Sequence, residues 1–235
     1  MNASKDMSAF MDEEIEIYKI ETLGALDGPG LRTVIFLQGC VMRCGYCHNA
    51  DSWRRGEGEM WTVKRLFDLV LRYKPYYKNT GGVTFSGGEA LMQADQLIPL
   101  VEVLKKEGVH IALDTSGALN NPASMALIDL CDLVILDIKA LDEAWHLKLT
   151  GHSMEKPLQV LNHLKVTNKP YWIRQVVLPG VAHNQQDDDA LDRLTEHPSR
   201  ERLELLPYHS MGNEKWQRWQ EKYKKNICSF LSKQI

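Results

Sequence analysis

The sequence predicts an α/β protein with a parallel sheet, in the form of an incomplete (β/α)6 barrel of the TIM type that is open along one side. Short runs of β-branched and apolar residues alternate with longer helical segments, and this alternation is typical of repeated β–α units. About six such units follow the first strand, which is too few for a closed eight-fold barrel of roughly 250 residues. The 235 residues therefore fit a partial barrel, with a doubly wound open sheet as the alternative.

The expected elements follow one another without a break. Strand patterns occupy residues 14–20, 33–37, 83–86, 110–115, 133–138, 171–178 and 202–207. Helical patterns occupy residues 63–76, 95–107, 122–131, 155–165, 187–196 and 214–230. Thr62 is placed to cap the first helix, Gly108 to end the second and Pro122 to begin the third. Because no linker or low-complexity tract interrupts the alternation, we expect one domain over residues 1–235, with a loose tail at 1–13.

Composition limits the partners and the compartment. The 28 basic and 31 acidic residues give a net charge of −3, which offers no electrostatic footprint for nucleic acid or an anionic membrane. No apolar run approaches the roughly 18 residues of a membrane span, and the polar start lacks the order of a secretion signal. We therefore expect a cytoplasmic protein without structural disulfides, with a monomer as the default state.

The cysteines are unevenly placed. Cys40, Cys44 and Cys47 fall within eight positions directly after the strand at 33–37. Zinc sites usually pair two short cysteine clips from distant segments, and this chain has no second clip. A cubane iron–sulfur cluster normally takes four cysteines, so three leave one iron open to a ligand. The spacing therefore favours a reactive 4Fe-4S cluster, whereas Cys131 and Cys228 stand alone in helical patterns and are expected to pack as apolar side chains.

Polar residues gather where the predicted parallel strands end. In chain order these are Gly87-Gly88-Glu89, Asp114-Thr115, Asp137-Ile138-Lys139 and Pro207-Tyr208-His209, with Arg174 projecting from within its strand. The carboxyl ends of parallel strands meet at one edge, where ligands bind in such folds. Glycines there allow close backbone approach, and Glu89 is placed to accept from an ammonium group. We therefore expect a cofactor cleft beside the cysteines.

These residues resemble a known family. The cysteine spacing, with Tyr46 before the last cysteine, resembles the signature of radical S-adenosylmethionine enzymes, and Gly87-Gly88-Glu89 resembles their second motif. The segments 27–32 and 205–209 make the resemblance more specific, because in order and spacing they are similar to the activating enzymes of pyruvate formate-lyase. Residues 48–130 contain no cysteine, which favours this single-cluster type over activators of glycerol, choline or aromatic-substrate enzymes.

The resemblance implies a role for each matching position. Cys40, Cys44 and Cys47 would hold the 4Fe-4S cluster. The implied contacts to S-adenosylmethionine are Tyr46, Cys47, His48, Asn49, Gly87, Gly88, Glu89, Asp114, Asp137, Ile138, Lys139, Arg174 and His209. A monovalent cation, sodium or potassium, is implied at Asp114, Thr115 and Asp137. Asp27 and Arg174 are implied as catalytic residues, and Asp27 with Arg32 matches the loop that closes over the substrate.

The implied reaction is one-electron chemistry. The reduced cluster cleaves S-adenosylmethionine to a 5′-deoxyadenosyl radical, which abstracts a hydrogen from a glycine of pyruvate formate-lyase, a formate acetyltransferase of anaerobic glucose metabolism. The implied partners are the glycine loop of that enzyme and flavodoxin or ferredoxin as electron donor. Two alternatives remain: an activase of another glycyl-radical enzyme such as anaerobic ribonucleotide reductase, and a zinc-bound binding module without catalysis.

Overall fold

The computed structural model describes residues 10–178, 185–208 and 215, and these residues form a single eight-stranded sheet. The strands are β1 (Glu14–Gly24), β2 (Arg32–Leu37), β3 (Glu59–Thr62), β4 (Gly82–Gly87), β5 (His110–Thr115), β6 (Leu133–Asp137), β7 (Tyr171–Val177) and β8 (Arg200–Pro207). Their order in the sheet is β3-β1-β2-β4-β5-β6-β7-β8. Strands β2 and β4 to β8 pair in parallel, whereas β1 and β3 pair antiparallel at one edge.

This order confirms the open (β/α)6 barrel. The six parallel strands lie in the sheet in the order in which they occur in the chain, as in a barrel. A doubly wound sheet instead reverses its strand order at a switch point, so the alternative prediction is wrong. Strands β3 and β8 end the sheet and are not paired with each other, so the described barrel is open on one side.

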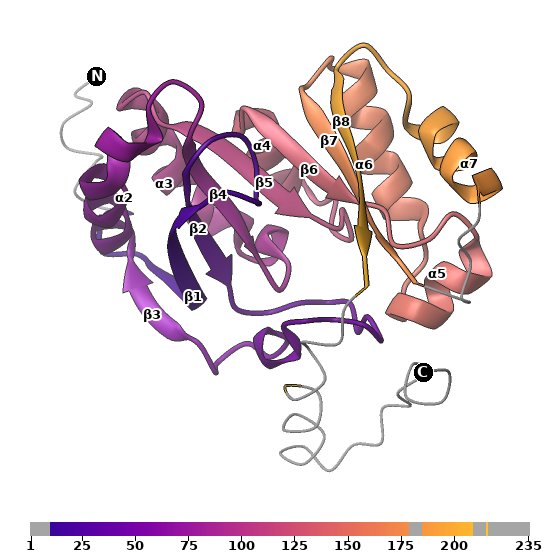
Figure 1. The fold of residues 1–235 in the computed structure, drawn as a ribbon. Coiled ribbons are helices and arrows are strands. Elements are labelled where there is room, and N and C mark those ends of the chain that lie inside the picture. The colour runs from indigo at the N-terminus through magenta and orange to yellow at the C-terminus, as the bar shows by residue number, and fades with distance from the viewer. Residues whose placement is uncertain (1–9, 179–184, 209–214, 216–235) are drawn as a thin grey trace.

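Helices cover the outer side of the curved sheet (Figure 1). They are α2 (Val63–Tyr77), α3 (Ala94–Lys106), α4 (Pro122–Leu130), α5 (Glu143–Thr150), α6 (Glu155–Val166) and α7 (Gln185–Thr195), with short 3-10 turns η1 (Ala50–Ser52) and η2 (Ala90–Gln93). Side-chain caps fix several helix starts, since Thr62, Asn121 and Asp142 each accept a backbone N–H of the first turn. The described residues contain no helix long and apolar enough to cross a membrane.

The two faces of the sheet carry different residues because strand side chains alternate. The outer face and the helices share one large apolar core, which includes Phe85, Leu113 and Ile173. The inner face holds a much smaller apolar layer of Ala112, Leu133, Ile135 and Trp172. Toward the carboxyl ends of the strands the inner face becomes polar. The sequence predicts the cofactor cleft at this end of the strands.

Some elements differ from the sequence prediction. Strand β3 and helix α5 were not predicted, and β1 extends four residues beyond its expected end. Residues 10–13 are not a loose tail, because Phe10 and Met11 pack against the core and the Glu13 carbonyl accepts the Val63 N–H at 2.9 Å. The predicted helix at 214–230, His209 and Cys228 fall on segments of which the structure describes only residue 215.

Candidate functional site

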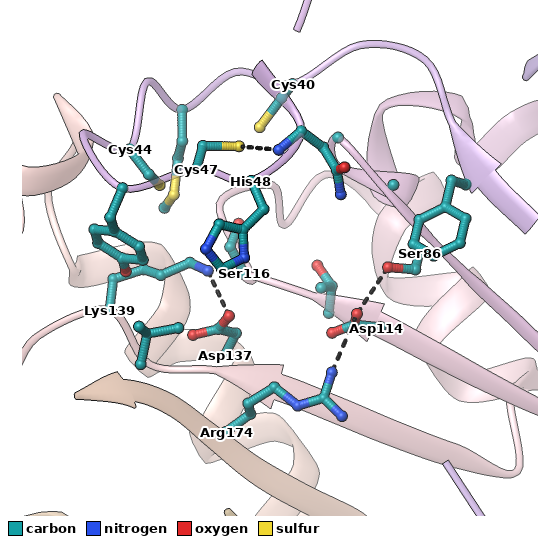
Figure 2. A pocket seen from close by; sticks show the side chains of 18 of the residues that line it. Cys40, Cys44, Cys47, His48, Ser86, Asp114, Ser116, Asp137, Lys139 and Arg174 are labelled. Atoms are coloured by element: carbon teal, nitrogen blue, oxygen red, sulfur yellow. Dashed lines mark hydrogen bonds and ion pairs between the residues drawn. The ribbon is translucent and has the colours of Figure 1, made fainter. Parts of the chain in front are cut away.

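The carboxyl ends of the parallel strands surround a cavity of about 280 Å³. Most of the predicted site residues line it: Asp27, Cys40, Cys44, Tyr46, Cys47, His48, Asn49, Gly87, Gly88, Asp114, Thr115, Asp137, Lys139 and Arg174. Figure 2 shows the three cysteines along one side of this pocket, with Asp114, Asp137 and Arg174 on the strands across from them. Sequence positions up to 147 residues apart are therefore brought to one site, as expected for parallel strand ends.

The cysteine loop follows β2 and turns tightly. The Cys47 N–H donates to the Cys44 carbonyl at 3.1 Å, which closes the turn between these two residues. Burial raises the pKa of the Cys44 thiol to about 12, and the pKa of Cys40 and of Cys47 is raised by burial as well. Thiols in such a setting become thiolates when a metal replaces the proton, so binding of iron would release protons here.

Helix α5 and His152 position the cysteine loop through hydrogen bonds. The N–H of Arg43 donates to the Thr150 carbonyl at 2.8 Å, and the N–H of Gly45 donates to the Leu149 carbonyl at 2.9 Å. His152, just after the helix, donates through Nε2 to the Val41 carbonyl at 2.9 Å. Two carbonyls that the end of α5 leaves free, together with the side chain of His152 after it, thus position the cysteine loop.

The two glycines after β4 are needed for close backbone packing. A Cβ on Gly88 would lie 2.2 Å from the Gly39 carbonyl oxygen, and one on Gly87 would lie 2.2 Å from the Leu37 nitrogen. Gly87 also has a φ of +120°, which L side chains rarely adopt. The glycines therefore let the end of β4 touch the start of the cysteine loop, where the Glu89 N–H donates to the Gly39 carbonyl at 2.7 Å.

Glu89 has a different setting from the one predicted for an ammonium acceptor. Its side chain is 2% exposed and is not among the residues that line the cavity. One carboxylate oxygen accepts the Thr115 hydroxyl at 2.6 Å and the Leu91 N–H at 3.2 Å, and the other accepts the Ser116 N–H at 3.0 Å and the Ser116 hydroxyl. The pKa of Glu89 is raised, because the effect of burial outweighs that of these hydrogen bonds, which lower it. In this structure Glu89 ties the loop after β5 to the loop after β4.

A buried ion pair lies on the floor of the cavity. Lys139 Nζ and Asp137 Oδ2 are 2.5 Å apart, and both side chains are about 15% exposed or less. Burial opposes the charge on Lys139, but Asp137 and Tyr46 outweigh it, so the pKa of Lys139 lies well above its usual value. The Tyr46 hydroxyl and the second carboxylate oxygen of Asp137 are buried without a partner among the described residues. Such atoms are suited to a bound polar ligand.

The Arg174 guanidinium lies close to three acidic side chains. It lies 3.6 Å from the Asp114 carboxylate, 3.8 Å from that of Asp27 and 3.0 Å from that of Glu204, and it donates to the Leu26 carbonyl at 3.0 Å. Burial and the nearby Asp114 raise the pKa of Asp27. Arg174 therefore fastens the loop before β2 to strands β7 and β8.

Two other predicted residues lie away from the cavity. Ile138 is 2% exposed and packs in the outer core, so only its backbone is near the site. Arg32 is fully buried, and donates to the Thr84 hydroxyl at 2.6 Å and to the Pro29 carbonyl at 3.0 Å. It holds the 25–31 loop against the inside of the barrel and does not line the cavity. His209 lies outside the described residues.

Sequence reasoning missed several residues of the site. Ser86 donates to Asp114 at 2.7 Å, and Glu204 neutralises Arg174 from the neighbouring strand. Trp53 and Ser116 also line the cavity. The alternation of side chains along β4 and β8 was the one available signal, because Ser86 and Glu204 lie on the inner face with Thr84 and Arg202.

The donor set fits an iron–sulfur cluster. The described residues contain no group of three His, Cys, Asp or Glu side chains close enough to share a single ion. In a cluster each cysteine binds a different iron, so three separated thiols on one loop suit it. Lys139 and the unpartnered oxygens of Tyr46 and Asp137 complete a polar pocket beside those thiols.

The comparisons with known proteins give the class of protein first. A family described as a 4Fe-4S single cluster domain matches residues 26–156, which is more than half of the chain. The fold is similar to that of QueE from Escherichia coli, at 18% identity with a TM-score of 0.55, covering 93% of this chain and 95% of that one. It is also similar to methylornithine synthase (PylB), at 15% identity with a TM-score of 0.57, covering 78% and 55%. The chain is a single-cluster 4Fe-4S protein on an open α/β barrel.

Sequence relatives identify the family. The chain is 41% identical over 215 residues to pyruvate formate-lyase 1-activating enzyme of Escherichia coli strain K12, covering 88% of this chain and 86% of that protein. It is 37% identical over 221 residues to pyruvate formate-lyase-activating enzyme of Clostridium pasteurianum, covering 93% and 92%. The chain belongs to the family of pyruvate formate-lyase activating enzymes, which confirms the resemblance drawn from its motifs.

Proposed function

We propose that this protein installs the glycyl radical of a pyruvate formate-lyase. The observation that carries the proposal is the single cavity in which the three-cysteine loop faces the polar ends of the parallel strands. When bound, the cluster and S-adenosylmethionine supply a 5′-deoxyadenosyl radical able to take hydrogen from a glycine Cα. The residues of the chain bind these groups, orient them and keep water away from so reactive a species.

Cys40, Cys44 and Cys47 are proposed as the cluster ligands. Three thiolates leave one iron open, and the polar floor of the cavity lies opposite them (Figure 2). The Lys139 ammonium suits the cofactor carboxylate, and the free Asp137 oxygen suits a donor such as a ribose hydroxyl or the amino group. His48, stacked on Tyr208 with ring centroids 6.2 Å apart, offers a flat surface for the adenine.

The predicted monovalent cation finds few free oxygens in the described site. The Thr115 hydroxyl donates to Glu89 and accepts the Gly117 N–H at 3.0 Å. One Asp114 oxygen accepts from Ser86 and lies near Arg174. The second Asp114 oxygen and the unpartnered Asp137 oxygen are the groups left to serve a cation, which remains a prediction.

The open side of the barrel is proposed as the entrance for the glycine loop of the partner enzyme. Strand β8 ends the sheet there, and Arg174 joins it to the loop that carries Asp27. Asp27 and Arg174 line the cavity, so a peptide strand that enters it at this edge would lie against them. A flavodoxin or ferredoxin as electron donor, a monomeric state and a cytoplasmic location belong to the same proposal.

The activation assay tests the proposal. Anaerobically purified protein is incubated with pyruvate formate-lyase, S-adenosylmethionine and a reductant, and EPR spectroscopy follows the glycyl radical. We expect a radical signal that depends on S-adenosylmethionine and is lost in Cys44→Ala. No signal with pyruvate formate-lyase, but a signal with another glycyl-radical enzyme such as anaerobic ribonucleotide reductase, would transfer the activity to that partner. Stoichiometric zinc without iron would support the non-catalytic binding module instead.

A further inference from the structure

Gln38 is a buried polar side chain just before the cysteine loop, and the proposed function gives it no role. It follows β2 and is 1% exposed. Its side-chain nitrogen Nε2 donates to the Asp51 carbonyl at 3.0 Å and to the Arg54 carbonyl at 2.7 Å. A side-chain amide has two N–H groups, so both are used here. These two bonds join the chain before Cys40 to the chain after Cys47.

Backbone hydrogen bonds close the loop at the same place. The Gly39 N–H donates to the Ser52 carbonyl at 2.6 Å, and the Cys40 N–H donates to the Trp53 carbonyl at 3.1 Å. Residues 40–53 therefore form a closed loop whose two ends are bonded to each other. All three cysteines belong to this loop.

A second buried amide fixes Gln38 in turn. Gln93, in η2, is fully buried, and its Nε2 donates to the Gln38 carbonyl at 2.9 Å and to the Glu16 carbonyl at 2.8 Å. Its Oε1 accepts the Glu16 N–H at 2.9 Å, and the Glu16 carbonyl also accepts the Gln38 N–H at 2.9 Å. Buried networks of this kind are rigid when their members are satisfied. The Gln38 amide is thus held toward residues 51–54 from a fixed base in β1 and η2.

We propose that Gln38 is a positioning residue for the cluster, which holds the two ends of the cysteine loop together before iron binds. The inference rests on the proposed assignment of Cys40, Cys44 and Cys47 as cluster ligands. Bringing the ends of a flexible loop together costs conformational entropy. If folding has already closed the loop, this cost does not weaken the binding of the cluster. Gln38 acts through the backbone of the loop, and residues that orient metal ligands in such a way typically change metal affinity tenfold to hundredfold.

The test compares the loss of iron from three proteins. Anaerobically purified wild type, Gln38→Met and Gln175→Met are mixed with excess EDTA, and the absorbance of the cluster is followed. Methionine has nearly the length of glutamine but no N–H. We expect Gln38→Met to lose its iron roughly tenfold to hundredfold faster than wild type. Gln175→Met is the matched control, because this buried amide donates to the Ile138 carbonyl at 3.1 Å, outside the cysteine loop. A Gln38→Met rate no faster than that of Gln175→Met would overturn the proposal.

Hydrogen exchange in the same proteins separates positioning from a general loss of stability. The backbone amides of residues 39–54 should exchange faster in Gln38→Met than in wild type, whereas those of strand β6 should keep their wild-type rates. Unchanged exchange at residues 39–54, or equally faster exchange throughout the chain, would contradict the assigned role.

The unaltered chain gives an independent answer if Gln38→Met does not fold. In full-length wild type from which iron has been removed, NMR should show slow solvent exchange of the Gln38 Nε2 hydrogens and of the Gly39 and Cys40 N–H groups. Fast exchange of these hydrogens would mean that the loop is not closed before iron binds, and would refute the inference. Failure of the ligand assignment itself is distinguishable, because Cys44→Ala would then keep the full iron content.

Discussion

Replacing Glu89 by glutamine should destabilise the protein, although the two side chains have the same shape. The Glu89 carboxylate accepts two hydrogen bonds from Ser116 on one oxygen and bonds from Thr115 and Leu91 on the other. The amide of glutamine has only one acceptor, so its NH2 group must face either Ser116 or the other two residues. If it faces Ser116, two N–H donors oppose each other and the Ser116 N–H has no acceptor.

A buried donor without a partner costs about 1–3 kcal/mol, so we expect a loss of that size in the free energy of unfolding. For a domain of this length, each kcal/mol lowers the melting temperature by about 2–4 °C. Circular dichroism on anaerobic preparations with matched iron content measures the change. Glu102→Gln is the control, because Glu102 is exposed on α3. If Glu89→Gln and Glu102→Gln melt at the same temperature, the role assigned to Glu89 is wrong.

Three further measurements test the site. Burial raises the folded-state pKa of Glu89 above 4.5. At pH values between the unfolded and the folded pKa, the folded protein therefore binds more protons than the unfolded chain. The free energy of unfolding then falls as the pH rises through this range. Denaturant titrations between about pH 4 and pH 8 should show a steeper fall in wild type than in Glu89→Gln, where the raised pKa of Asp27 still contributes, and an equal slope in both would contradict the prediction. Gly88→Ala should lose most of its iron, because the new Cβ would lie 2.2 Å from the Gly39 oxygen. Gly45→Ala is the control and should keep its iron, because nothing lies within 4 Å of its Cβ. Equal iron contents in the two variants would contradict the packing argument. Lys139→Met should weaken S-adenosylmethionine binding roughly tenfold to hundredfold by removing a charge-assisted hydrogen bond; calorimetry showing wild-type affinity would exclude the proposed contact.

The parts of the fold that depend on local sequence pattern were predictable. The six parallel strands and most helices carry their own periodicity and caps, as in Thr62 before α2 and Asn121 before α4. Alternation along a strand also predicted which residues face the cleft, since Asp114 and Asp137 both line the cavity. These features need no knowledge of distant contacts.

The missed elements are stabilised by segments far away in the sequence. Strand β3 is a four-residue edge strand whose hydrogen-bond partner, β1, lies more than thirty positions earlier. Helix α5 is short and lacks a clear apolar stripe, and its carbonyls bind the cysteine loop about one hundred residues before it. Its local signals, Asp142 as N-cap and Gly151 in the left-handed region at the C-terminus, were present but are weak for so short a segment.

The setting of Glu89 shows the same limit inside the site. A carboxylate after a Gly-Gly turn suggested a ligand contact, and its position along the chain was correctly read as the end of β4. Its partners, Thr115 and Ser116, come from the next strand of the sheet. Only the register of β4 and β5 brings these residues together, and no local pattern encodes which polar group will be used inside the protein. The same holds for the pairing of Arg174 with Glu204.

The central claim is that the cavity holds S-adenosylmethionine on the open iron of a cluster bound by Cys40, Cys44 and Cys47. The most direct test is the EPR spectrum of the reduced, anaerobically purified protein recorded with and without S-adenosylmethionine. Because the cofactor would bind the iron itself, its addition should change the g-values of the cluster signal. A cluster signal that is identical with and without saturating S-adenosylmethionine would contradict the claim.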